Sequence, residues 1–203
     1  MVEPKFRGEG VRRSSEPRRG LPPFLRLLIV VGLGAGLYYG VTFGVRVYVD
    51  HRIAEKVGTN VVDFALRDTE GVVWRSSELR GNWIVLHFVR SQCHVCIAER
   101  RTIVDFEKRL DPAKARLFGV LLDPVAGYPE EMTHRTLELL DFGFPVLLAD
   151  ADFVDTFHGQ GWTQVTPVTY VIDPTGRIVH ALRGRQDLQH LLDTLPESVR
   201  THG

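Results

Sequence analysis

The only two cysteines of the chain stand three residues apart, in Cys93-His94-Val95-Cys96. They follow the apolar run 84–89, which is typical of a buried strand, and they open a stretch that reads as a helix. A thiol in the first turn of a helix faces unpaired N–H groups and the positive end of the helix dipole, which favour its thiolate. Cys96 lies one turn later on the same side and can attack a mixed disulfide on Cys93. The spacing therefore predicts a redox pair in which Cys93 attacks and Cys96 resolves.

Two other uses of paired cysteines fit less well. A zinc site needs two further ligands, and the eight histidines offer no second pair at ligand spacing. Two unreactive buried thiols would meet at a strand–helix junction only by coincidence. We expect no metal and no cofactor other than the disulfide itself.

Strand and helix patterns alternate around the cysteines, which predicts an α/β domain with a mixed sheet. A turn at Asp173-Pro174-Thr175-Gly176 predicts a hairpin near the end of the chain. The expected strands are 61–66, 72–74, 84–89, 116–122, 145–149, 168–172 and 177–182, and the expected helices are 93–110, 130–140 and 186–195.

Composition excludes several classes of protein. The chain has 203 residues, of which 44% are hydrophobic, too many for a mostly disordered protein. Its net charge of zero argues against binding to nucleic acid by bulk charge. The charge is uneven, however, since residues 1–26 carry a net +4 and the remainder a net −4. Such asymmetry indicates a membrane or a partner.

An uncharged stretch of nineteen residues, 27–45, follows the basic tail. As a helix it would rise about 28 Å, close to the hydrocarbon thickness of a bilayer. We expect a disordered cytoplasmic tail (1–23), an uncleaved membrane anchor (24–48), a juxtamembrane spacer (49–60) and one α/β domain (61–203). The positive-inside rule places that domain outside the cytoplasm, on the periplasmic side of an inner membrane.

Four glycines recur every fourth residue within the anchor, at Gly32, Gly36, Gly40 and Gly44. They could let a second helix approach closely. General enrichment of glycine in membrane helices explains them equally well.

The segments DFALRDTEGVVWRSSELRGNWIVLHFVRSQCHVC (63–96) and TPVTYVIDPTGRIVHALRG (166–184) resemble the thioredoxin-like family. The resemblance covers about residues 60–195. It is specific to the membrane-anchored TlpA/ResA/CcmG-like branch of the redoxin/AhpC-TSA superfamily. It implies a thioredoxin-like fold, with a central mixed sheet flanked by helices, and thiol–disulfide oxidoreductase activity.

The resemblance also implies roles for residues outside the cysteine pair. Thr166-Pro167 matches the family's cis proline, which faces the disulfide and contacts substrate; a trans proline at the start of an edge strand is the alternative. His87 lies six residues before Cys93, where thioredoxins have a buried Asp. We expect it either to take the Cys96 proton as a general base or to be a hydrogen-bonded core residue.

The chain departs from the family inside the motif. The family commonly has a proline between the cysteines and a tryptophan before them, whereas this chain has His94-Val95 and Ser91-Gln92. A histidine beside Cys93 would stabilise its thiolate and make the pair more oxidising. Trp162 either lines the substrate groove or belongs to the core.

Three other functions share some of these sequence features. A Sco-like copper protein would use cysteines four apart and a distal histidine, for which His158 is a candidate. A peroxiredoxin would have Pro and Thr at fixed positions before its reactive cysteine, and neither cysteine here has them. A non-catalytic subunit of a membrane complex would use the glycine face.

The intact pair of Cys93 and Cys96 favours the oxidoreductase interpretation. The family resemblance implies a DsbD/CcdA-like membrane reductant as electron donor, and apocytochrome c or a cytochrome oxidase copper site as target.

Overall fold

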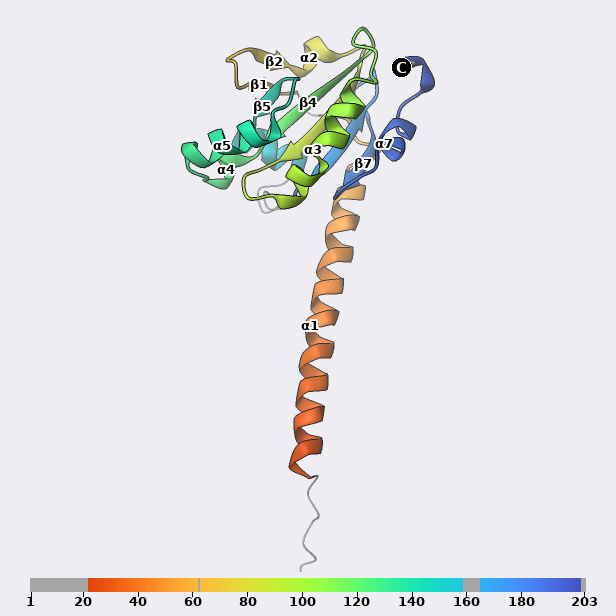
Figure 1. The fold of residues 1–203 in the computed structure, drawn as a ribbon. Helices are drawn as coiled ribbons and strands as arrows, with labels where there is room; N and C mark the ends of the chain where they lie inside the picture. Colours follow the sequence, from red (N-terminus) through yellow and green to blue (C-terminus); the bar gives the residue numbers. More distant parts are fainter. Residues whose placement is uncertain (1–21, 62, 159–164, 202–203) are drawn as a thin grey trace, which may run out of the picture. The chain divides into compact units, whose positions relative to one another are not determined.

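The computed structural model describes residues 22–61, 63–158 and 165–201. The chain divides into two units, residues 1–45 and 46–203. The second unit is a five-stranded sheet with helices on both faces (Figure 1). This architecture is the thioredoxin-like mixed sheet that the sequence predicts.

The helices and strands follow the expected order, with a few short additions. The strands are β1 (Ala65–Arg67), β2 (Val73–Arg75), β3 (Trp83–Val89), β4 (Ala115–Leu121), β5 (Val146–Leu148), β6 (Val168–Ile172) and β7 (Ile178–Arg183). The helices are α1 (Pro23–Ala54), α2 (Ser76–Leu79), α3 (His94–Glu107), α4 (Asp123–Ala126), α5 (Glu130–Leu140), α6 (Ala151–Phe153) and α7 (Leu188–Asp193). A π-helical stretch (Val154–His158) and a 3₁₀ turn (Glu197–Val199) complete them.

Strand β3 is the centre of the main sheet, whose order is β5-β4-β3-β6-β7. It runs parallel to β4 and antiparallel to β6, with His87 opposite Gly119 on one side and Thr169 on the other. Six of its seven residues are buried, as expected for a strand covered on both faces. Strands β1 and β2 form a separate hairpin that meets β5 through an isolated bridge from Asp68 to Leu147.

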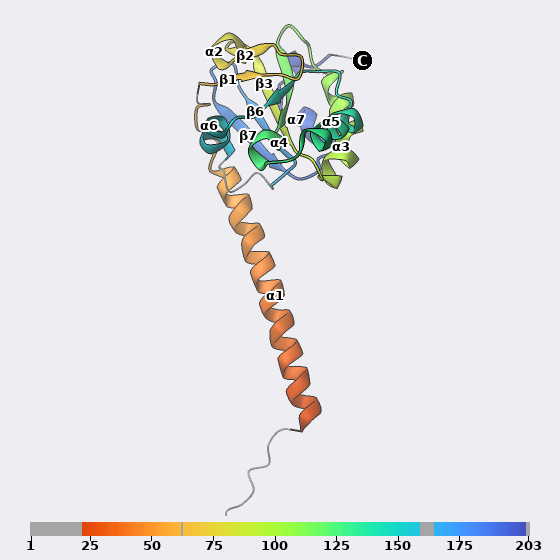
Figure 2. The same ribbon diagram turned by 90° about the vertical axis from the view of Figure 1, so that its left-hand side faces the viewer.

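Alternate residues of β3 belong to different cores. Val85 packs with Ile103 and Phe106 of α3 and with Leu191 of α7. Leu86 and Phe88 of β3 point to the opposite face, where they pack with β1, α2, α6 and Ile53 of α1. Helices α3 and α5 lie side by side (Figure 2), and the Arg100 side chain of α3 donates to the Leu140 carbonyl oxygen of α5 over 2.5 Å.

Helix α1 is long and apolar enough to cross a membrane, which is consistent with an anchor. A Cβ atom on Gly32, Gly36, Gly40 or Gly44 would meet nothing within 4 Å. These positions are therefore open on the helix surface, and their use in helix association stays a prediction.

The helix continues past residue 48, where we expected the anchor to end. Residues 46–54 belong to the second unit, and Val49 and Ile53 are buried in its core. Asp50 pairs with Arg183 of β7, and the Gly58 N–H donates to the Ile178 carbonyl oxygen over 2.8 Å. The segment that we expected to be a spacer is thus packed against the domain, because its apolar residues at i and i+4 share one helix face.

Replacing Ile53 by Ala should lower the free energy of unfolding of the domain by about 2–4 kcal/mol, because the change leaves a cavity in the core. The measurement is urea unfolding of the full chain in detergent. Val57→Ala is the control, since Val57 is 44% exposed and its truncation should cost less than about 0.5 kcal/mol. Equal, small losses in both variants would show that this segment does not stabilise the domain.

Candidate active site

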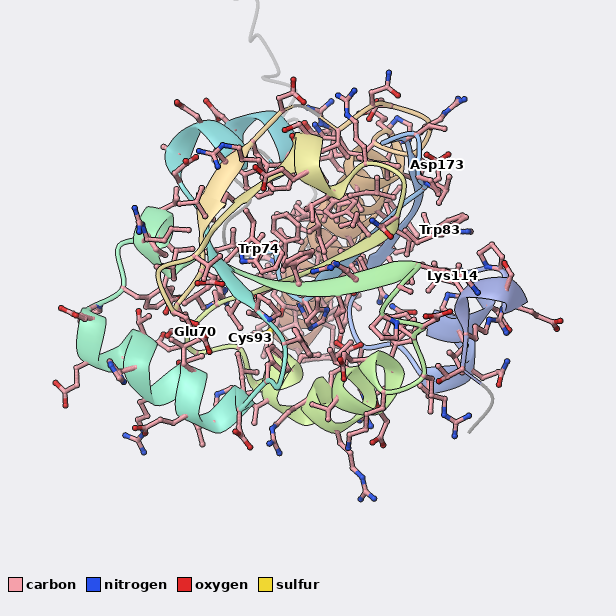
Figure 3. The ribbon with its side chains drawn as sticks, turned by 90° about the horizontal axis from the view of Figure 1, so that it is seen from above. Glu70, Trp74, Trp83, Cys93, Lys114 and Asp173 are labelled. Carbon is pink, nitrogen blue, oxygen red and sulfur yellow. A yellow bond between two sulfur atoms is a disulfide. The ribbon has the colours of Figure 1, made fainter. Side chains whose placement is uncertain are left out.

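Cys93 and Cys96 form a disulfide, with an S–S distance of 2.12 Å and a Cα–Cα distance of 5.3 Å. The bond lies where β3 gives way to α3. Figure 3 shows Cys93 on the opposite side of the domain from Trp83 and Asp173, which mark the other end of β3 and β6. The pair therefore occupies the carboxyl end of the central strand, where ligands and reactive groups of α/β folds are commonly found.

Cys93 is the N-cap residue of α3, and its sulfur accepts the Cys96 N–H over 3.1 Å. This is one of the N–H groups that the first turn of a helix leaves without a backbone partner. A thiolate on Cys93 would gain the same hydrogen bond and the favourable field of the helix dipole. The arrangement suits Cys93 to be the reactive thiol.

The two sulfurs differ in access to solvent. Cys93 is 7% exposed and Cys96 is 1% exposed, within a cluster that includes Val89, Leu121 and Leu140. Cys93 is therefore the more accessible of the two residues to an incoming protein sulfur. This geometry supports the assignment of Cys93 as attacking and Cys96 as resolving residue.

The Thr166–Pro167 peptide bond is cis, as the family resemblance led us to expect. It immediately precedes β6, and the register pairs Val168 with Phe88 of β3. Because β3 and β6 are antiparallel neighbours, Pro167 enters β6 at the same end at which β3 leads to Cys93. The hydroxyl of Thr166 is buried and has no hydrogen-bond partner within the described residues.

His87 lies fully buried in β3, on the face that packs against α3. Its Nδ1 is 2.9 Å from the Thr169 hydroxyl oxygen, and its Nε2 has no partner within the described residues. Burial lowers the pKa of His87 to about 4, so the ring is neutral at physiological pH. The hydrogen bond fits a core role, while the low pKa makes this imidazole a weak proton acceptor near pH 7.

Glu99 is a buried carboxyl group that sequence reasoning missed. It lies on α3 one turn after Cys96, and no part of it is exposed. One carboxylate oxygen accepts the Gln186 N–H over 2.7 Å, and the other has no partner within the described residues. Burial raises the pKa of Glu99 to about 7, against the lowering effects of that hydrogen bond and of Arg185.

A signal for Glu99 was present in the sequence. Cys96, Glu99, Ile103 and Phe106 recur at the spacing of one helix face, and all four are buried. A glutamate within such a stripe must enter the interior. In the sequence, however, Glu99 is followed directly by Arg100 and Arg101, and three charged residues in a row are typical of an exposed segment.

The remaining expected site residues are His94 and Trp162, and His158 was the candidate copper ligand. His94 and Val95 are exposed beside the disulfide, where a protein substrate could contact them. Trp162 lies outside the described residues, as does the side chain of His158.

Comparison with known proteins agrees with this geometry. The AhpC/TSA family matches residues 57–181. The thiol-disulfide oxidoreductase ResA of Geobacillus thermodenitrificans is 24% identical over 172 residues, covering 83% of this chain and 91% of that protein. ResA of Halalkalibacterium halodurans is 28% identical over 162 residues, covering 79% of this chain and 86% of that protein.

Solved structures show the same fold. The exposed lipoprotein thioredoxin Etrx1 of Streptococcus pneumoniae superposes with a TM-score of 0.57 at 23% identity, covering 66% of this chain and 97% of that one. StoA of Bacillus subtilis gives a TM-score of 0.54 at 18% identity, covering 66% and 96%. The chain therefore belongs to the AhpC/TSA family. By homology to ResA, and with Cys93 and Cys96 paired, it is a thiol–disulfide oxidoreductase.

Proposed function

We propose that this protein is a membrane-tethered oxidoreductase that exchanges electrons with protein cysteines outside the cytoplasm. The observation that carries the proposal is the Cys93–Cys96 disulfide, with its more exposed sulfur on the amino end of α3. The apolar helix α1 and the basic residues before it support the tethering and the orientation.

The order of the disulfide exchange follows from the positions of Cys93 and Cys96. In the reduced protein the Cys93 thiolate attacks one sulfur of a target disulfide, forming a mixed disulfide and releasing a target thiolate. Cys96 then loses its proton and attacks the Cys93 sulfur, which closes the Cys93–Cys96 disulfide and frees the second target thiol. Two electrons pass to the target, and the reverse sequence oxidises a dithiol.

Glu99 is the best-placed acceptor for the Cys96 proton. It lies one turn from Cys96 on the same buried face, one of its carboxylate oxygens has no hydrogen-bond partner among the described residues, and its pKa is about 7. A group with such a pKa can both take and return a proton at physiological pH. His87, with a pKa of about 4, is less suited to this task, and we assign it to holding the strand through Thr169.

The substrate is proposed to be an extended protein segment that carries a cysteine pair. We expect Thr166, the cis Pro167 and the exposed His94 to contact such a segment, since Pro167 enters β6 at the end at which β3 leads to Cys93. Maturation of cytochrome c or of cytochrome oxidase, with electrons from a DsbD/CcdA-like protein, is the pathway that the family resemblance implies.

Cys96→Ser should trap the mixed disulfide, because Cys93 can still attack but nothing resolves the product. The full chain in detergent would be mixed with an oxidised peptide bearing the Cys-x-x-Cys-His motif of apocytochrome c, and the adduct weighed by mass spectrometry. Cys93→Ser is the matched control and should give no adduct. Trapping through Cys96 instead would reverse the assigned roles, and the absence of any adduct on this peptide would contradict the cytochrome-related target.

Glu99→Gln should remove one part of the pH dependence of stability. Because the folded pKa is raised from 4.5 to about 7, the folded protein binds more protons than the unfolded chain between these values. Stability should then fall as pH rises through this window, by at most about 1.4 kcal/mol per pH unit, and level off above it. Urea unfolding of the oxidised chain from pH 4 to pH 8 measures this slope. An equal slope in Glu99→Gln would show that Glu99 does not cause it.

Reporter fusions test the orientation. Alkaline phosphatase fused after residue 60 should be active, since it folds only outside the cytoplasm, while a cytoplasmic fluorescent reporter at the same place should be dark. The opposite pair of results would put the redox domain in the cytoplasm and overturn the proposed location.

A further inference from the structure

The loop between β3 and α3, residues 90–92, is fixed to the rest of the domain by a buried carboxylate. We call these three residues the redox loop, because Cys93 follows them directly. Asp123, just after β4, is 1% exposed. Its Oδ1 accepts the Ser91 backbone N–H over 2.7 Å, and its Oδ2 accepts the Ser91 hydroxyl over 2.5 Å. Hydrogen bonds to an ionised group are about twice as strong as neutral ones.

Helix α5 completes the hydrogen bonding of these groups. The Thr133 hydroxyl donates to the same Asp123 Oδ2 over 2.8 Å. The hydroxyl oxygens of Thr136 and Ser91 are 2.7 Å apart, and the Met132 carbonyl oxygen lies 3.3 Å from the Ser91 hydroxyl. Ser91 is therefore held from two directions within the protein interior.

Arg90 holds the backbone carbonyl group of Ser91. Its Nη1 donates to the Ser91 carbonyl oxygen over 2.7 Å and to the Tyr128 hydroxyl over 2.6 Å. Both backbone polar groups of Ser91 thus have partners that tie the redox loop to the segment after β4.

The conformation of the redox loop needs such support. Gln92, between Ser91 and Cys93, has a φ of 59°, in the left-handed region that residues other than Gly, Asn and Asp rarely adopt. Gln92 is exposed, and its side chain contacts only the Met132 sulfur over 3.5 Å among the hydrogen bonds described. The left-handed backbone conformation of Gln92 is therefore stabilised mainly by the hydrogen bonds of the preceding residue, Ser91.

We propose that Ser91 and Asp123 are positioning residues of the redox site, which keep the Cys93 sulfur at the amino end of α3 when the disulfide is open. The disulfide itself restrains Cys93 in the oxidised protein. Reduction removes that restraint, and the redox loop then becomes the main connection that holds Cys93 in the N-cap position. This role rests on the proposed function of Cys93 as the attacking thiol.

A purely structural cluster makes a different prediction. Loss of one of its hydrogen bonds would lower the stability of the fold, wherever in the cluster the bond lies. It would leave the reactivity of Cys93 unchanged. A positioning role requires that only the loss of hydrogen bonds to the redox loop changes the reactivity and the pH profile of Cys93.

The experiment uses the full chain in detergent with Cys96→Ser, which leaves Cys93 as the only thiol. Ser91→Ala in this background removes the side-chain bonds but leaves the Asp123 charge in place. We expect its alkylation by iodoacetamide at pH 7 to slow by about threefold to tenfold. The pH profile of that reaction should move upward by about half a unit to one unit, as the thiolate loses its place on α3.

Thr133→Val is the matched control, because it removes a donor from the same Asp123 oxygen without touching the redox loop. Its pH profile should coincide with that of the parent. Equal shifts in the two variants, or an unshifted profile in folded Ser91→Ala, would overturn the positioning role.

A measurement on the chain without substitutions covers the case in which Ser91→Ala does not fold. The Ser91 amide should exchange with deuterium as slowly in the reduced protein as in the oxidised one. Exchange at the rate of an exposed loop amide after reduction would overturn the proposal. Alkylation of Cys93 needs no partner protein and therefore tests the positioning role separately from the proposed function. If the alkylation rates follow the expected pattern but the protein exchanges no disulfide, the proposed function is contradicted and the positioning role stands.

Discussion

The Cys96 amide donates to the Cys93 sulfur over 3.1 Å, and this contact depends on three separate parts of the domain. Strand β3 must end at Val89 so that the chain turns back over the sheet. Helix α3 must begin at His94 and pack through Ile103 and Phe106, which directs its free N–H groups at the sulfur. The redox loop must then place Cys93 between the two. A shift in any of these elements would separate the sulfur from the helix terminus that favours its charge.

The groups around the disulfide differ in how deeply they are buried. Cys96, Glu99 and His87 are all at most 1% exposed, whereas Cys93 is 7% exposed. A second negative charge on Cys96 or Glu99 beside a Cys93 thiolate would be poorly solvated. Burial therefore disfavours the charged form of Glu99 and raises its pKa.

The sequence predicted those features that a short pattern encodes. The cysteine spacing, the run 84–89 and the turn at Asp173 predicted the redox pair, a central buried strand and the hairpin near the end of the chain, and the family resemblance implied the thioredoxin-like fold. Glu99 was missed because it stands directly before Arg100 and Arg101 in the sequence and was read as part of an exposed charged run, and Asp123 because Asp-Pro reads as a loop. The buried end of α1 escaped notice for another reason. Val49 and Ile53 have the hydropathy of membrane residues, and only tertiary packing assigns them to the domain.

The buried end of α1 has a consequence for proteolysis. Proteases preferentially cut poorly ordered, exposed segments. Here residues 46–54 are helical, and backbone hydrogen bonds join residues 58–61 to Gly176, in the turn before β7, and to Ile178, its first residue. Cleavage at this junction would first require part of the domain to unfold, so the redox domain should resist being shed from its anchor.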